Sequence, residues 1–156
     1  MERSKRKTDF LTEPGFFSLA VLVEIIRQTE DKGAAVPLST VARKLGMSLS
    51  YAEKLAVILR REGLVKTVRG VRGGFAPAKA PQDIPAAAVV RAAYGHSILR
   101  ESGTDSMRKV QKLRAHLHNL NYLYLDKITV ADIIADQLDQ NPHVGLLTAI
   151  LREAPR

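Results

Sequence analysis

Apolar residues recur three and four positions apart in several stretches of the chain, and this spacing predicts helices. The first stretch covers residues 15–30, where the repeating positions are Phe16, Leu19, Val23 and Ile26. A short helix is predicted over residues 85–94 and a long one over about 105–125. Another is expected after Thr129, whose side chain is suited to cap it. The pattern therefore predicts a mainly α protein.

Two short helices joined by a tight turn are predicted between residues 38 and 62. Ser39 is expected to cap the first and Ser48 the second, with Gly46 in the turn. The inward face of the second helix consists of Ala52, Leu55, Ala56 and Leu59. The positions left for its outer face are Leu49, Ser50, Tyr51, Glu53, Lys54, Arg60 and Arg61. This is the outline of a helix-turn-helix, although any pair of antiparallel helices would give it.

The segment that follows, LVKTVRGVRGGFAPAKA, predicts a β-hairpin with GVRGG at its tip. The three tip glycines, Gly70, Gly73 and Gly74, permit positive φ and close approach to another backbone. Arg69 and Arg72 lie where a hairpin would meet a DNA strand, and guanidinium groups suit the electronegative minor groove. A hairpin directly after a helix-turn-helix predicts a winged helix, and an ordinary exposed hairpin is the alternative.

An apolar stripe runs along the predicted long helix, with its members three and four residues apart. Its members are Val110, Leu113, Leu117, Leu120 and Tyr124. At 1.5 Å per residue the helix is about 30 Å long, which is more than one small domain covers. The stripe therefore predicts a homodimer held by this helix, and burial against the same chain is the alternative.

Charge and composition reduce the number of function classes that fit the chain. Residues 1–80 hold 15 Lys and Arg against 8 Asp and Glu, whereas residues 81–156 hold 9 against 8. A basic half joined to a nearly neutral half indicates a polyanion-binding domain, and a basic solubilising surface is the alternative. The chain has no cysteine, which excludes disulfides, thiolate metal sites and cysteine nucleophiles. No apolar run is long enough to span a membrane, so a cytoplasmic protein is expected.

At this point a family resemblance can be read from the residues. The stretch VPLSTVARKLGMSLSYAEKLAVILRREGLVKTVRGVRGGF resembles the DNA-binding core of the IscR-type winged-helix transcription regulators. This is the Rrf-two family, which includes NsrR and CymR. Its motifs Ser-Tyr-Leu-Glu, Leu-Arg-x-x-Gly-Leu-Val and Arg-Gly-x-x-Gly-Gly-Tyr correspond here to residues 50–53, 59–65 and 69–75. PGFFSLAVL resembles the first helix and LDKITVADIIAD the end of the dimerisation helix, so the resemblance covers nearly all of 14–138.

The resemblance implies a homodimeric regulator, usually a repressor, on two-fold symmetric double-stranded DNA. It implies that Ser50 and Glu53 reach base edges, that Tyr51 contacts the backbone and that Arg69 enters the minor groove. A carboxylate can indeed accept from cytosine N4. Ser48 and the tip glycines Gly70, Gly73 and Gly74 are expected to belong to the same DNA-binding surface. Lys54 and Arg72 are expected to contact phosphates. The same is expected of the basic arm, whose charged residues are Arg3, Lys5, Arg6 and Lys7, unless that arm is an unstructured tail.

The chain departs from the family in its sensor. Many members hold an iron–sulfur cluster with three cysteines, and some add a histidine. The positions that would carry the last cysteine and the histidine are Arg108 and Gln111 here, so neither a cluster nor a thiol sensor is expected. His116 and His118 are two residues apart and fall on different faces of a helix, which does not favour a metal site. No cofactor is expected, and the absence of a P-loop or nucleophile elbow argues against an enzyme.

Two functions remain open from the sequence. The first is a DNA-binding repressor whose signal is a small molecule, a partner protein or nothing. The second is an adaptor that uses the winged helix to dock a partner protein, a role in which two arginines at a glycine-rich tip would have no use. The expected regions are a basic arm at 1–13, a winged helix-turn-helix at 14–95, a loop at 96–105, dimerisation helices at 106–138 and a C-terminal tail at 139–156.

Overall fold

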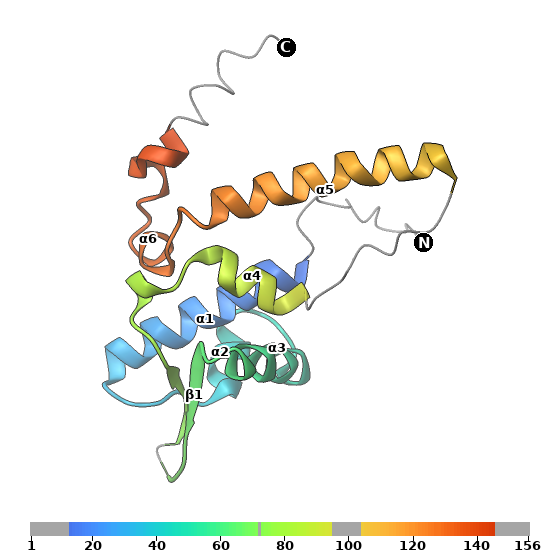
Figure 1. Cartoon of the computed structure of the whole chain (residues 1–156). Coiled ribbons are helices and arrows are strands. Elements are labelled where there is room, and N and C mark those ends of the chain that lie inside the picture. The colour runs from blue at the N-terminus through green and yellow to red at the C-terminus, as the bar shows by residue number, and fades with distance from the viewer. Residues whose placement is uncertain (1–12, 72, 95–103, 146–156) are drawn as a thin grey trace, which may run out of the picture.

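The computed structural model describes residues 13–71, 73–94 and 104–145. Figure 1 shows a body of packed helices with a β-hairpin at one end and one long helix at the other. In chain order the elements are α1 (Glu13–Lys32), α2 (Leu38–Lys44), α3 (Leu49–Arg61), β1 (Val65–Val68), β2 (Gly74–Pro77), η1 (Pro81–Asp83), α4 (Ala86–Tyr94), α5 (Asp105–Leu125), α6 (Val130–Ile134) and η2 (Leu138–Gln140). None of the described helices combines the length and apolar character needed to cross a membrane.

The core forms around α1, which packs against α3, α4 and β2. Leu22 and Ile25 of α1 are fully buried, and they meet Leu55 and Leu59 of α3 and Val89 of α4 in one apolar cluster. Apolar residues three and four positions apart put these side chains on one face of each helix. The cluster fixes α3 on the body, so the opposite face of α3 is left to the outside.

The helix-turn-helix and the wing form as the sequence predicts. β1 and β2 are antiparallel, with Val65 opposite Pro77 and Val68 opposite Gly74. Ser48 caps α3, its hydroxyl accepting a hydrogen bond from the Tyr51 backbone N–H at 3.3 Å. The observed elements confirm the predicted fold class, a mainly α winged helix with a two-stranded wing and a long C-terminal helix.

The predicted cap of α2 is wrong. The helix begins at Leu38, so Ser39 lies inside its first turn and Pro37 occupies the capping position without any side-chain hydrogen bond. Pro37 has φ −62° and ψ 132°, an extended conformation that its ring favours. Leu38 is buried, and its packing brings this residue into the helix. The helix therefore begins two residues earlier than a cap at Ser39 would place it, with Leu38 buried in its first turn.

The chain joins α5 to the body at the carboxyl end of the helix. The Ala86 N–H donates to the Ile128 carbonyl at 2.8 Å, and the Val130 N–H donates to the Ile84 carbonyl at 2.9 Å. Thr129 caps α6 in a capping box with Asp132, as its position in the sequence predicts. From this attachment α5 extends beside the body toward its free amino end (Figure 1).

Several sequence predictions fall outside the described residues. These are the basic arm, Arg72, most of the loop before α5 and the part of the C-terminal tail beyond residue 145.

Candidate nucleic-acid interface

The outer face of α3 presents polar side chains to the outside of the molecule. Ser50, Glu53 and Lys54 are all exposed, whereas Ala52, Leu55, Ala56 and Leu59 are buried beneath them. This division follows from the helical repeat, because the apolar positions occupy one side and leave the other polar. The sequence predicted both faces, and the structure places the three polar residues together on the amino-terminal half of α3.

Tyr51 and Ser48 are placed differently from the three exposed residues. Tyr51 is half-buried, and its ring meets Phe17 of α1 edge to face with the centroids 5.7 Å apart. The Ser48 hydroxyl is already engaged in capping α3. Both residues therefore have a structural role in holding the start of α3. Sequence reasoning missed Phe17, because only the tertiary fold brings α1 beside this turn.

The wing carries Arg69 directly after β1. Arg69 is exposed, and the turn beyond it is closed by a hydrogen bond from the Gly73 N–H to the Gly70 carbonyl at 2.8 Å. Gly70 has φ +112°, a conformation that side chains rarely adopt. Val71 stands fully exposed at the tip, and sequence reasoning did not single it out. The geometry therefore presents one described guanidinium and one apolar side chain at the end of a narrow hairpin.

The base of the wing is fixed to the loop before α2. Phe75 of β2 and Val36 exchange two backbone hydrogen bonds of 2.8 Å. These bonds form an isolated antiparallel bridge beside the hairpin. Gly74 lies so close to this crossing that a Cβ atom there would overlap the backbone of Val36 and Pro37. Position 74 therefore requires glycine because the backbone of Val36 and Pro37 leaves no room for a side chain. This contact ties the base of the wing to the loop that leads into α2.

The charges of this surface are not neutralised by the protein. Across residues 13–71, 73–94 and 104–145, no ion pair engages Glu53, Lys54 or Arg69. An unpaired exposed cation can neutralise a phosphate, and an unpaired carboxylate can accept a hydrogen bond from a base amino group. In Figure 1, α3 and the wing lie toward the end of the molecule away from α5. The candidate interface is therefore separate from the long helix.

The apolar stripe of α5 is left largely uncovered by the part of the chain that the structure describes. The exposed fractions are 62% for Val110, 59% for Leu113, 40% for Leu117 and 61% for Leu120, while Tyr124 is half-buried. Residues 13–71, 73–94 and 104–145 therefore do not bury these four aliphatic side chains, which speaks against the alternative of burial against the same chain. Contiguous exposed apolar side chains on a helix are typical of an interface with another molecule.

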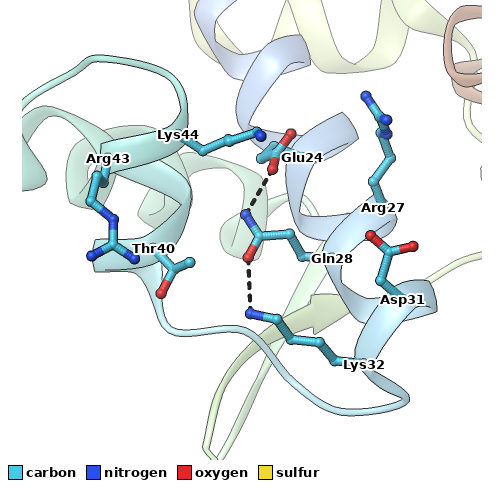
Figure 2. A pocket seen from close by; sticks show the side chains of 8 residues that line it. All are labelled: Glu24, Arg27, Gln28, Asp31, Lys32, Thr40, Arg43 and Lys44. Carbon is cyan, nitrogen blue, oxygen red and sulfur yellow. Dashed lines mark hydrogen bonds between the residues drawn. The ribbon is translucent and has the colours of Figure 1, made fainter.

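A polar pocket of about 460 Å³ lies between α1 and α2 (Figure 2). Glu24 and Gln28 are mostly buried there; the Gln28 amide donates to the Glu24 carboxylate at 2.7 Å and accepts from the Lys32 ammonium at 3.4 Å. The lining residues are Glu24, Arg27, Gln28, Asp31, Lys32, Thr40, Arg43 and Lys44. Four cations and two carboxylates line the pocket, so its side chains carry a net positive charge.

Comparison with known proteins identifies the family. The profile of the Rrf2 (Rrf-two) family, described as an iron-dependent transcriptional regulator, matches residues 11–136. The chain belongs to the Rrf2 family. It is therefore a transcription regulator of a DNA-binding class, and its α3 and wing are the winged-helix elements of that class.

Individual relatives agree with this assignment. The regulator IscR of Cereibacter sphaeroides is 29% identical over 152 residues, a match that covers 92% of this chain and 98% of that protein. The solved structure of T. potens IscR is 28% identical, with a TM-score of 0.62 over 80% of this chain and 85% of that one. CymR, the global cysteine regulator of B. subtilis, is 22% identical with a TM-score of 0.59, covering 81% of this chain and 96% of that one. This last similarity supports the fold.

The iron named in the Rrf2 description does not fit the donor set of this chain. An iron–sulfur cluster needs thiolate ligands, and the sequence has no cysteine. Arg108, at one expected ligand position, lies exposed 3.7 Å from Asp105. His118 packs edge to face on Tyr122 with the centroids 4.6 Å apart. Within the described ranges, no three His, Asp or Glu side chains are grouped so that they could hold a metal ion.

Proposed function

We propose that the protein is a homodimeric repressor that binds a two-fold symmetric operator and works without an iron–sulfur cluster. The observation that carries the proposal is the pairing of two exposed surfaces on one chain. One is the polar interface of α3 and the wing, and the other is the uncovered stripe of α5. A two-fold dimer through α5 would present two copies of α3 to one DNA duplex, as helix-turn-helix dimers do.

The side chains of the interface take different roles in this proposal. Ser50 and Glu53 read base edges in the major groove, where a carboxylate accepts from cytosine N4. Lys54 contacts phosphate, and Tyr51, held by Phe17, approaches the backbone. Arg69 enters the minor groove, where its weakly hydrated charge meets the concentrated negative potential of A·T-rich steps.

The proposal also includes a candidate site for an effector that would regulate DNA binding. The pocket between α1 and α2 offers a small anionic effector partners on both helices. Because α2 packs on α3, a ligand there would act on the helix that reads the DNA.

The test is a set of binding titrations on a site that the wild-type protein selects from random-sequence DNA. With roughly six to ten phosphate contacts per dimer, affinity is expected to fall about a thousandfold or more between 50 and 200 mM salt. Arg69→Ala is expected to weaken binding most where the wing faces A·T-rich steps. Glu53→Ala is expected to lose about 1–3 kcal/mol of discrimination at one base pair while overall affinity holds or rises.

Two variants control for net charge away from the interface. Lys127→Ala removes one exposed cation, and Glu30→Ala removes one exposed carboxylate, and neither is expected to change base discrimination. A chelator is expected to leave every titration unchanged. Binding that is independent of salt, or that prefers no sequence over bulk DNA, would contradict the proposal and favour the adaptor.

A further inference from the structure

Arg91 joins the body of the protein to the end of α5 through two contacts. Its guanidinium donates to the Asp126 carboxylate at 3.1 Å and lies over the ring of Tyr122, 4.7 Å from the ring centre. Among the described residues, this is the one ion pair between α4 and the end of α5. A planar guanidinium suits such a position because it can pair with a carboxylate and stack on an aromatic ring at the same time.

The partners of Arg91 lie on one side of α5. Tyr122 and Asp126 are four residues apart, and His118, which packs on Tyr122, lies a further four residues back. At 100° per residue, the apolar stripe lies about 160° around the helix from this row. The helix therefore has two nearly opposite faces. One is fastened to its own body by Arg91, and the other presents exposed leucines.

The contacts of Arg91 affect the direction in which α5 points, whereas other contacts fix the place where α5 joins the body. The backbone hydrogen bonds at Ile84, Ala86, Ile128 and Val130 hold the chain just beyond the helix, and Leu125 at the end of α5 is buried in the core. Tyr122 lies one turn back along α5, so its contact with Arg91 resists rotation about that end. The 21 residues of α5 span about 32 Å, and a change of 10° at the fixed end moves the free end by about 5 Å.

We propose that Arg91 is a positioning residue that sets the distance between the two α3 helices of a dimer, and hence the half-site spacing of the operator. The inference rests on the proposed homodimer. One helical turn of DNA is 34–36 Å for 10–10.5 base pairs, so a change of about 5 Å in the separation of the two α3 helices would correspond to between one and two base pairs. The ion pair and the cation–π contact each contribute about fivefold at most to an equilibrium constant, which is enough to bias an angle without holding the fold together.

The test measures the affinity of full-length protein for operators whose half-sites are moved apart or together in single base-pair steps. The half-sites come from the sequence that the wild type selects from random DNA. Wild type is expected to bind its best spacing about tenfold or more tightly than spacings two base pairs away. For Arg91→Ala the ratio is expected to fall to about threefold or less, or the optimum to move by one base pair.

Two variants accompany Arg91→Ala. Arg91→Lys keeps the charge but loses the planar stacking, and an intermediate profile is expected. Arg108→Ala removes a cation from the free end of α5, and the wild-type profile is expected. Sedimentation is expected to show dimers for every variant, and affinity for an isolated half-site is expected to stay constant.

The outcomes separate this inference from the function on which it rests. A wild-type protein without any spacing preference overturns the proposed dimer on a two-fold site, and the inference with it. A wild-type preference that Arg91→Ala retains, or an equal loss of affinity at every spacing, overturns the role of Arg91 alone.

Discussion

The winged helix and α5 use the same apolar pattern with opposite results. In α1, Leu22 and Ile25 repeat at helical spacing and are fully buried. In α5, Leu117 and Leu120 repeat at the same spacing and remain 40% and 61% exposed. Both stretches form long helices, of 20 and 21 residues. The two regions differ in what surrounds them, since α1 lies inside a cluster of helices and α5 touches the body mainly at one end.

This difference shows that a periodic apolar stripe can be buried either within its own chain or by another molecule. The stripe shows that one side of a helix avoids water, and it does not show which molecule covers that side. The winged helix covers its own apolar faces, so its stability belongs to the single chain. In the proposed dimer, the stripe of α5 would gain its stabilisation from association, so its free energy would depend on protein concentration.

The largest effect is expected from placing charge on the stripe. In Leu117→Lys/Leu120→Lys, four leucines per dimer lose burial worth about 1.5–3 kcal/mol each, or about 6–12 kcal/mol in all. The dimer dissociation constant is therefore expected to rise by about four orders of magnitude or more. Sedimentation measures the change, and circular dichroism is expected to show a winged helix that still melts cooperatively.

The matched control is Met107→Lys/Leu123→Lys, which adds the same charge at two other exposed apolar positions of α5. These residues lie outside the stripe, and the control is expected to remain dimeric. A wild-type protein that sediments as a monomer at micromolar concentration would refute the contrast between the two regions.

A smaller effect is expected from truncating one leucine in each region. Leu22→Ala leaves a cavity in the buried cluster and is expected to lower the free energy of unfolding by about 2–5 kcal/mol. Leu113→Ala removes an exposed side chain and is expected to change the unfolding of dilute monomer little, while weakening dimerisation. Denaturant unfolding at two protein concentrations separates these terms. Equal losses in the dilute samples would mean that α5 is part of the same core.

The smallest effect is expected at the helix caps. Thr129 forms a capping box with Asp132 at the attachment of α5, with hydrogen bonds of 2.8 and 3.2 Å to backbone N–H groups. Thr104 caps the free end of α5 through one bond of 3.4 Å. Thr129→Ala is expected to cost about 1 kcal/mol of stability and Thr104→Ala less, as measured by thermal unfolding. A larger cost at Thr104 would show that the free end of α5 is more firmly held than its contacts indicate.

Much of the candidate interface could be predicted because its signals are local. Ser48 caps α3 through a residue three positions away, and the inward face of α3 follows from spacings of three and four. The strands are adjacent in the chain, so their register depends on a short turn. The prediction that Ser39 caps α2 was wrong. Burial of Leu38 in the tertiary structure outweighed the local preference for a hydroxyl side chain at the cap.

The sequence by itself determined the helical periods, the hairpin with its glycine tip, the basic half and the absence of any thiolate ligand, since each depends on residue type or on neighbours a few positions apart. Only the tertiary structure decided contacts between distant residues. Phe17 meets Tyr51, Val36 bridges Phe75, and Arg91 reaches Asp126 across 35 positions. It also decided that α5 leaves its stripe uncovered. The physical reason is that periodicity fixes which side chains share a face, whereas packing of the whole chain fixes what that face meets.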